Sequence, residues 1–167
     1  MIKRLVLRLV VGAILASGAA VAAEAPSSRT TTEMYRDWTR VCLEQNSTSQ
    51  CEIKQNLLNT NSQLVSVISV ASPDGADGPV MQFALPHMLD LTVPLTVTVD
   101  GEKKVQLPFN FCNQAACFAL ADGDSELFEY FKDGNRGEVN SRAINGEELR
   151  LDFSLRGFSS ALAALVR

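Results

Sequence analysis

The chain contains few of the side chains and sequence motifs that most enzymes use for catalysis. Among its 167 residues there is one histidine, His87. A single imidazole excludes a multi-histidine metal site. Three common motifs are also missing: no serine stands in a G-x-S-x-G elbow, no C-x-x-C pair occurs, and no glycine-rich phosphate loop precedes a helix. Composition still allows a Ser-His-Asp triad, since Asp90 is near, but we interpret His87 as a turn residue at a strand edge. We predict no catalytic residue, no cofactor and no metal site.

Long hydrophobic runs are absent after the first 23 residues. The N-terminus combines a basic start at Met1–Arg4, an apolar run from Leu5 to Ala16 and small residues at Ala20–Ala23. This pattern predicts a secretory signal over residues 1–23, cleaved after Ala22 or Ala23. The alternative is a retained membrane anchor, but the run is interrupted by glycine and serine and is short for a spanning helix. We therefore expect an exported chain with no transmembrane helix after cleavage.

Basic residues are in the minority. The full chain has 15 Lys and Arg against 19 Asp and Glu, and cleavage would remove Lys3, Arg4 and Arg8, leaving 12 against 19 and a net charge of −7. Nucleic-acid binding requires cations that displace counterions, so this balance predicts no nucleic-acid partner. It also disfavours electrostatic docking on anionic lipid.

The remaining chain fits one domain, residues 33–167, preceded by a flexible segment over residues 24–32 that has a proline and no large apolar residue. Short runs rich in Val, Leu, Ile, Phe and Thr alternate with turn residues, which is typical of an antiparallel sandwich or barrel, and we favour a sandwich. The predicted strands are 35–43, 51–57, 64–71, 80–85, 94–99, 103–109, 116–120, 138–143 and 148–155.

Two short helices are also predicted. One begins at Asp124-Ser125-Glu126, where a capping residue and a carboxylate stand at the positive end of the helix dipole, and ends by Gly134. The other is C-terminal, with Phe158, Leu162 and Leu165 at helical spacing. We interpret the second helix as a lid over an open end of the core.

The segment from Leu95 to Phe109 predicts a hairpin with an odd number of loop residues. A two-residue turn would place apolar residues opposite polar ones. A three-residue loop at Val99-Asp100-Gly101 instead pairs Leu95 with Val105 and puts Gly101 in the left-handed conformation that glycine tolerates.

Four cysteines form two close pairs, Cys42 with Cys51 and Cys112 with Cys117. An exported chain meets an oxidising compartment, where such pairs become disulfides. Three connectivities are possible, and the local one costs the least chain entropy and is our prediction. A redox pair or a zinc site is the alternative, but the spacings C-x8-C and C-x4-C fit either poorly.

Two acidic turns invite comparison with calcium loops. Asp122–Glu126 begins like one, but Leu127 stands where the glycine is expected and Asp133 where the final glutamate is expected. Helix capping explains the same carboxylates. The turn at residues 74–78 is explained by ordinary turn chemistry. Trp38, four residues before Cys42, is predicted to be a core residue.

An ordered series of short motifs resembles the invasion-associated locus B family of exported Gram-negative proteins, from about Tyr35 to the C-terminus. The series consists of Trp38, Cys42, Cys51, Leu85-Pro86, Val99-Asp100-Gly101, Asn110-Phe111-Cys112, Cys117 with Ala119, and Ser154-Leu155-Arg156-Gly157-Phe158-Ser159-Ser160-Ala161-Leu162. The chain departs from the family pattern at His87-Met88, where an aliphatic-glycine pair is typical, and before the D-G turn, where Val93-Pro94 lacks a glycine-containing segment.

The resemblance implies an immunoglobulin-like antiparallel β-sandwich with two local disulfides, located in the periplasm or at the outer membrane. It implies no established enzyme activity and no catalytic residues. The favoured hypothesis is a non-catalytic envelope protein that binds an envelope or surface partner, whether protein, glycan or another molecule. The alternative is an uncharacterised periplasmic enzyme. A deep pocket with convergent polar groups would favour the enzyme, and an exposed apolar patch or a free edge strand would favour the binding protein.

Overall fold

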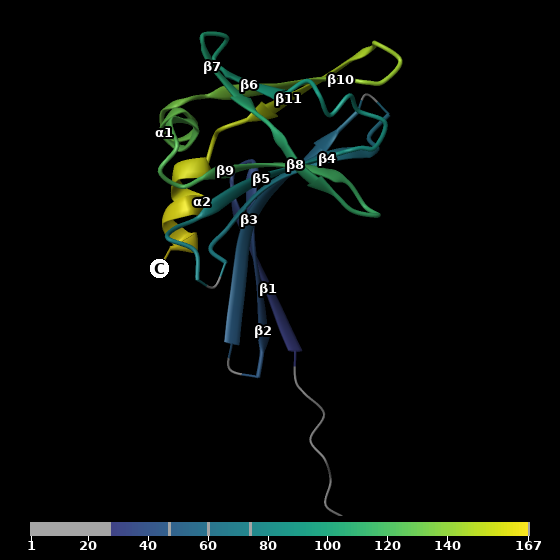
Figure 1. The fold of residues 1–167 in the computed structure, drawn as a ribbon. Helices are drawn as coiled ribbons and strands as arrows, with labels where there is room; N and C mark the ends of the chain where they lie inside the picture. The colour runs from purple at the N-terminus through teal and green to yellow at the C-terminus, as the bar shows by residue number, and fades with distance from the viewer. Residues whose placement is uncertain (1–27, 47, 60, 74, 167) are drawn as a thin grey trace, which may run out of the picture.

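A computed structural model describes residues 28–46, 48–59, 61–73 and 75–166. These residues form two antiparallel sheets and two short helices (Figure 1). The predicted mainly β, two-sheet architecture is therefore confirmed. The predicted signal segment, residues 1–23, and the first part of the predicted flexible segment, residues 24–27, lie outside the described residues.

The larger sheet has seven strands in the order β1-β2-β3-β4-β5-β9-β8. Their bounds are β1 Ser28–Tyr35, β2 Trp38–Gln45, β3 Thr48–Leu58, β4 Leu64–Ala71, β5 Val80–Leu85, β8 Phe109–Cys112 and β9 Cys117–Asp122. The smaller sheet has four strands in the order β11-β10-β6-β7. Its strands are β6 Leu95–Val99, β7 Lys103–Leu107, β10 Arg136–Arg142 and β11 Glu148–Ser154.

Residues 28–32 differ from the sequence prediction. They form most of β1, where the sequence predicted a flexible segment, and they pair with β2 without a bulge. Their side chains are almost all exposed, so the pairing rests on backbone hydrogen bonds rather than on core packing. Strands β1, β2 and β3 extend past the rest of the molecule as a three-stranded arm, at the bottom of Figure 1.

The core lies between the two sheets. Alternate residues of β5, Met81, Phe83 and Leu85, are buried, and so are Leu95 and Val97 of β6. The period of two places one face of each strand inward, which is how two facing sheets share one core. The same cluster includes aromatic residues of both helices, so the helices complete the core.

The two predicted helices are present, as α1 Glu126–Asp133 and α2 Phe158–Leu165. Ser125 has the extended conformation of an N-cap, but its hydroxyl donates to the Asp122 carbonyl (2.6 Å) instead of accepting from the helix. Glu126 and Glu129 in the first turn and Lys132 in the last suit the helix dipole. Helix α2 packs on β1, β2 and β3 and contacts α1, as the predicted lid would.

The β6–β7 hairpin has an odd loop, as predicted, but its register is shifted. Val99 pairs with Lys103, so the loop is residues 100–102, and Leu95 faces Leu107 rather than Val105. The shift is by two residues, so the inward face is unchanged. Gly101 has the predicted positive φ of 76°, and Asp100 has a φ of 50°. The Asp100 carboxylate accepts hydrogen bonds from the backbone N–H groups of Asn135 and Arg136, which explains why the turn closes one residue later.

Candidate functional site

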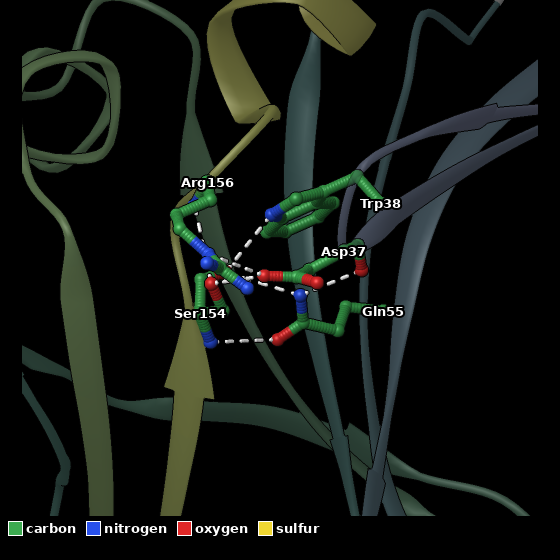
Figure 2. Close-up of polar contacts among 5 residues, drawn as sticks. All are labelled: Asp37, Trp38, Gln55, Ser154 and Arg156. Carbon is green, nitrogen blue, oxygen red and sulfur yellow. Dashed lines mark hydrogen bonds and ion pairs between the residues drawn. The ribbon is translucent and has the colours of Figure 1, made fainter.

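A polar network joins the two sheets where β11 leads into α2 (Figure 2). Its members are Asp37 in the β1–β2 turn, Trp38 at the start of β2, Gln55 in β3, Ser154 at the end of β11 and Arg156 just before α2. Residues more than 90 positions apart in the chain therefore meet here.

Gln55 is the centre of the network and is only 9% exposed. Its amide nitrogen donates to the backbone carbonyls of Asp37 (2.8 Å) and Ser154 (3.1 Å), and its amide oxygen accepts from the Ser154 backbone N–H (2.9 Å). The Trp38 indole also donates to the Ser154 carbonyl, at 3.0 Å. One amide side chain thus pairs with three backbone groups at the joint, and the Ser154 carbonyl has a second donor in Trp38.

The Asp37 carboxylate binds two side chains from the far end of the sequence. Its Oδ2 accepts from the Ser154 hydroxyl at 2.6 Å and from the Arg156 Nε at 3.0 Å. The hydrogen bond from Ser154, and then that from Arg156, lower the pKa of the Asp37 carboxyl below its ordinary value. Asp37 therefore stays ionised and acts as a hydrogen-bond acceptor.

This arrangement suits a joint better than a reaction centre. The Ser154 hydroxyl donates a hydrogen bond to the Asp37 carboxylate, and the lowered pKa of Asp37 makes this carboxylate a weaker base than an ordinary aspartate, which disfavours activation of Ser154 as a nucleophile. A groove of about 590 Å³ lies beside it, lined by residues that include Met34, Asn56 and Arg136. The network closes one side of this groove and holds β3 against β11.

The turn after Arg156 holds α2 close to β1. Gly157 has a φ of 94°, and a side-chain carbon at this position would meet the Tyr35 carbonyl oxygen. Phe158 follows and contacts Trp38 edge to face, with ring centroids 5.0 Å apart. Trp38 is fully buried, so its predicted core role is confirmed. Residues 154–158 thus connect the two sheets to helix α2.

The four predicted cysteines form two disulfides, Cys42–Cys51 and Cys112–Cys117. In each disulfide the two cysteines are directly opposite on adjacent strands, with α-carbons 4.0 Å apart. The local connectivity is the one predicted from the spacing. Both bridges lie in the larger sheet, one in the arm and one at the β8–β9 hairpin.

The other residues singled out in the sequence lie apart from the network. His87 is exposed in a bend after β5, with its Nε2 3.3 Å from the Gln114 carbonyl oxygen. The two acidic turns meet, since Asp77, Asp122 and Asp124 line one open pocket of about 640 Å³. Within the described part of the chain, no group of three or more His, Cys, Asp or Glu side chains could hold a metal ion.

Exposed apolar side chains occur in or next to the loops 59–63, 86–94 and 143–147, whose backbones lie on the right side of Figure 1. We call this group the loop-end surface; it consists of Leu58, Leu64, Met88, Leu91 and Ile144. Leu58 and Leu64 are directly paired, and the Ile144 N–H donates to the Met88 carbonyl at 3.0 Å. Met88 and Ile144 are 67% and 63% exposed.

Sequence reasoning did not find Asp37 and Gln55, because nothing in the sequence relates them to Ser154. The loop-end surface also escaped it, since Leu58 and Leu64 stand at strand ends and Met88, Leu91 and Ile144 are single apolar residues in turn regions. An apolar residue next to turn-forming residues was the only available signal, as in Ala143-Ile144-Asn145-Gly146. None of the helices in the described ranges is long and apolar enough to span a membrane.

Comparison with known proteins gives consistent matches. A family model described as "Invasion associated locus B (IalB) protein" matches residues 38–166. Two proteins of Brucella abortus, from strain 2308 and from biovar 1 (strain 9-941), are named as invasion protein B homologs. Each is 28% identical to this chain over 153 residues, which is 89% of this chain and 87% of theirs. The crystal structure of invasion associated protein b from Bartonella henselae has a similar fold, with a TM-score of 0.68 and 24% identity. That match covers 81% of this chain and 95% of the other.

Proposed function

The chain belongs to the invasion-associated locus B family, and from this membership we propose that it is an exported protein that acts by binding rather than by catalysis. Its location would be the periplasm or the outer membrane of a Gram-negative bacterium. The secretory pattern at residues 1–23 and the two disulfides support export, because disulfides persist in oxidising compartments. The relatives are named as invasion proteins, but no role in host-cell entry is assigned to this chain.

The loop-end surface is the observation that carries the binding proposal. Five exposed apolar side chains lie in or next to three loops: Leu58 and Leu64 are paired at the ends of β3 and β4, and the loops that carry Met88 and Ile144 are joined by a backbone hydrogen bond. Apolar residues gathered in this way mark interaction sites, since isolated ones are common and clusters are not. Backbone pairing holds these loops, through Leu58 with Leu64, Leu89 with Ala143 and the bond from the Ile144 N–H to the Met88 carbonyl, so the surface would lose little conformational entropy on binding.

The polar network is the candidate site for the enzyme alternative, and its geometry does not favour that. The Ser154 hydroxyl is committed to Asp37, and the His87 ring lies by the β8–β9 turn. We therefore propose a structural role for the network and a binding role for the loop-end surface. Its partner would be an envelope or surface molecule that buries the apolar side chains.

The binding proposal is tested in a deletion strain complemented with variants of the chain. We expect Met88→Ser with Ile144→Ser to fail in complementing envelope integrity, while His87→Ala complements like the wild type. Val166→Ser, which changes a side chain with 60% exposure just after α2, is the matched control. A photo-reactive residue at Leu91 should capture the partner in intact cells, identified by mass spectrometry.

Two outcomes would contradict the proposal. If the double variant is exported, folds and complements fully, then the loop-end surface is not the binding site. If His87→Ala folds and is exported but does not complement, a catalytic site near residue 87 must be considered instead.

A further inference from the structure

Among the residues that the structure describes, the outer edge of β1 is a free edge of the larger sheet. Strand β1 is the last strand of the larger sheet, and no strand among the described residues pairs with its outer side. It is eight residues long, pairs regularly with β2 and contains Thr30, Thr31 and Thr32 in succession. Threonine is β-branched and favours strands, and β1 has no proline, glycine or bulge that would discourage another strand from adding.

The other three edges carry features that block pairing. Strand β8 is only four residues long, and its register to β9 shifts within the strand. Strand β7 presents the exposed Lys103 and Lys104. Strand β11 alternates exposed charges at Glu148, Arg150 and Asp152. Short strands, irregular pairing and edge charges are the usual means of preventing edge-to-edge association. Strand β1 is neither short nor irregular, and its two exposed charges, Arg29 and Glu33, have opposite signs.

The backbone groups that face this open edge can be identified. Cys42 and Cys51 have α-carbons 4.0 Å apart, which is the spacing of a pair that does not exchange backbone hydrogen bonds. Cys42 therefore directs its backbone groups away from β3, toward its β1 partner Thr31. Along a strand, successive residues direct their N–H and C=O groups to opposite sides. Since the groups of Thr31 point toward Cys42, those of Thr30 and Thr32 point outward.

We propose that β1 pairs antiparallel with β1 of a second copy of the chain, about a two-fold axis at Thr31. Thr30 then hydrogen-bonds with Thr32 of the second copy, using the outward backbone groups of both. Arg29 lies directly opposite Glu33 of the second copy, and the axis creates this pair twice. The two larger sheets become one continuous sheet. Isologous contacts of this kind are the commonest way to form a dimer.

Charge complementarity supports this register. Within one chain Arg29 faces Glu44, and Glu33 faces Arg40, with Arg40 Nη1 3.4 Å from Glu33 Oε2. Pairing at Thr31 therefore makes a row of alternating charge across the seam: Glu44, Arg29, then Glu33 and Arg40 of the second copy. Sliding by two residues either way, the smallest slip that keeps the hydrogen bonds, puts Arg29 opposite Thr31 or Tyr35 and loses both cross-seam pairs.

The test is sedimentation velocity of the exported, processed protein over a range of concentrations. We expect the wild type to pass from monomer to dimer as its concentration rises. Arg29→Glu and Glu33→Arg should each weaken the dimer by roughly tenfold, because each places like charges opposite one another twice. An equimolar mixture of the two variants should associate again, since one chain then offers two acidic residues and the other two basic ones. Arg150→Glu on β11 is the charge-matched control and should leave the dimer unchanged.

Thr30→Pro provides a second test that does not depend on charge. It removes an outward N–H and spares the pairing with β2, so the monomer should fold normally and not dimerise. The proposal is overturned if the wild type stays monomeric up to its solubility limit. It is also overturned if folded Arg29→Glu and Thr30→Pro variants dimerise like the wild type. These two variants decide the matter if Glu33→Arg, which also loses the contact with Arg40, fails to fold.

Discussion

Single side chains replace regular strand pairing at the joint between the sheets. Gln55 makes three hydrogen bonds to backbone atoms of Asp37 and Ser154, and Asp37 returns two through its carboxylate. Shortening this buried amide would remove the Gln55 bond to the Asp37 carbonyl and the Gln55 bond from the Ser154 N–H, while the Ser154 carbonyl would keep its bond from Trp38. The joint therefore depends on the exact side-chain lengths of two residues that sequence patterns do not single out.

Asp37 should make the stability of the protein depend on pH in the acid range. Its pKa is lowered in the folded state from an ordinary value of 3.8, chiefly by the Ser154 hydroxyl and then by Arg156. A depressed folded pKa contributes stability that is present above pH 3.8 and lost as the pH falls through the folded value. Asp37→Asn should therefore be less stable than the wild type at neutral pH, and the difference should shrink below about pH 4.

Urea unfolding of both proteins at several pH values measures this difference. Asp77→Asn, in an exposed turn, removes the same charge without touching the network and should show no such convergence. A stability gap for Asp37→Asn that stays constant down to pH 2 would contradict the assignment.

Gly157 and Gly146 illustrate two different reasons why a position favours glycine. Both have positive φ, 94° and 88°, but an added side-chain carbon meets the Tyr35 carbonyl at Gly157 and open space at Gly146. Gly146→Ala should cost about 1 kcal/mol of unfolding free energy, the cost of the left-handed conformation alone. Gly157→Ala should cost roughly 2–4 kcal/mol, because α2 must also move away from β1. Equal losses in thermal or urea unfolding would show that the close approach is not a constraint.

At the scale of elements, strands with a buried face were predictable and strands without one were not. Leu64–Ala71 and Val80–Leu85 have the same bounds in the sequence prediction and in the structure, since their apolar content is high and turn residues flank them. Strand β1 escaped prediction because its polar side chains carry no burial pattern. The predicted strand 103–109 joined the start of β8 to β7. In the structure Pro108 separates the two strands, and the Leu120 N–H donates to the Asn110 side chain within the β8–β9 pairing.

Register and tertiary contacts were harder to predict from the sequence than strand positions. The parity of the β6–β7 loop followed from the alternation of apolar residues, but the two-residue shift depends on Asp100 reaching Asn135 and Arg136. The members of the polar network come from the two ends of the domain. Their meeting follows from how the sheets pack, which local pattern does not encode.

The two disulfides brace separate hairpins and should contribute similarly. Cys42–Cys51 spans 9 positions and Cys112–Cys117 spans 5, and in the chain-entropy model such loops give roughly 2–3 kcal/mol each. Replacing either pair by alanine should lower the free energy of unfolding by that amount, measured as a lower urea midpoint with little change in the slope. The four-alanine variant should lose about the sum, because the bridges are at opposite ends of the seven-stranded sheet and do not share partners. A single-pair variant as stable as the wild type would show that its bridge is not structural.

At the scale of the whole molecule, one core connects both sheets and both helices. Phe131 of α1 contacts Phe83 of the larger sheet, Phe153 of the smaller sheet and Phe158 of α2. Neither sheet can separate from the other without exposing this aromatic cluster. Strand β3, which runs from the arm to Leu58 of the loop-end surface, contributes Ile53 and Leu57 to the same core, so the proposed partner binding and dimer formation would use different parts of one packed molecule.

Unfolding of the monomer should therefore be a single cooperative transition. Trp38 is the only tryptophan and is buried against Phe158, so its fluorescence reports the joint between β2 and α2. Far-UV circular dichroism reports both sheets together. We expect the two urea transitions to coincide, because loss of either sheet exposes the shared core. The Arg29→Glu variant is the protein to use, since dissociation of a dimer would add a concentration-dependent step. A fluorescence transition that precedes the dichroism transition would show instead that α2 and the polar network open before the sheets do, and that the molecule has two stability units.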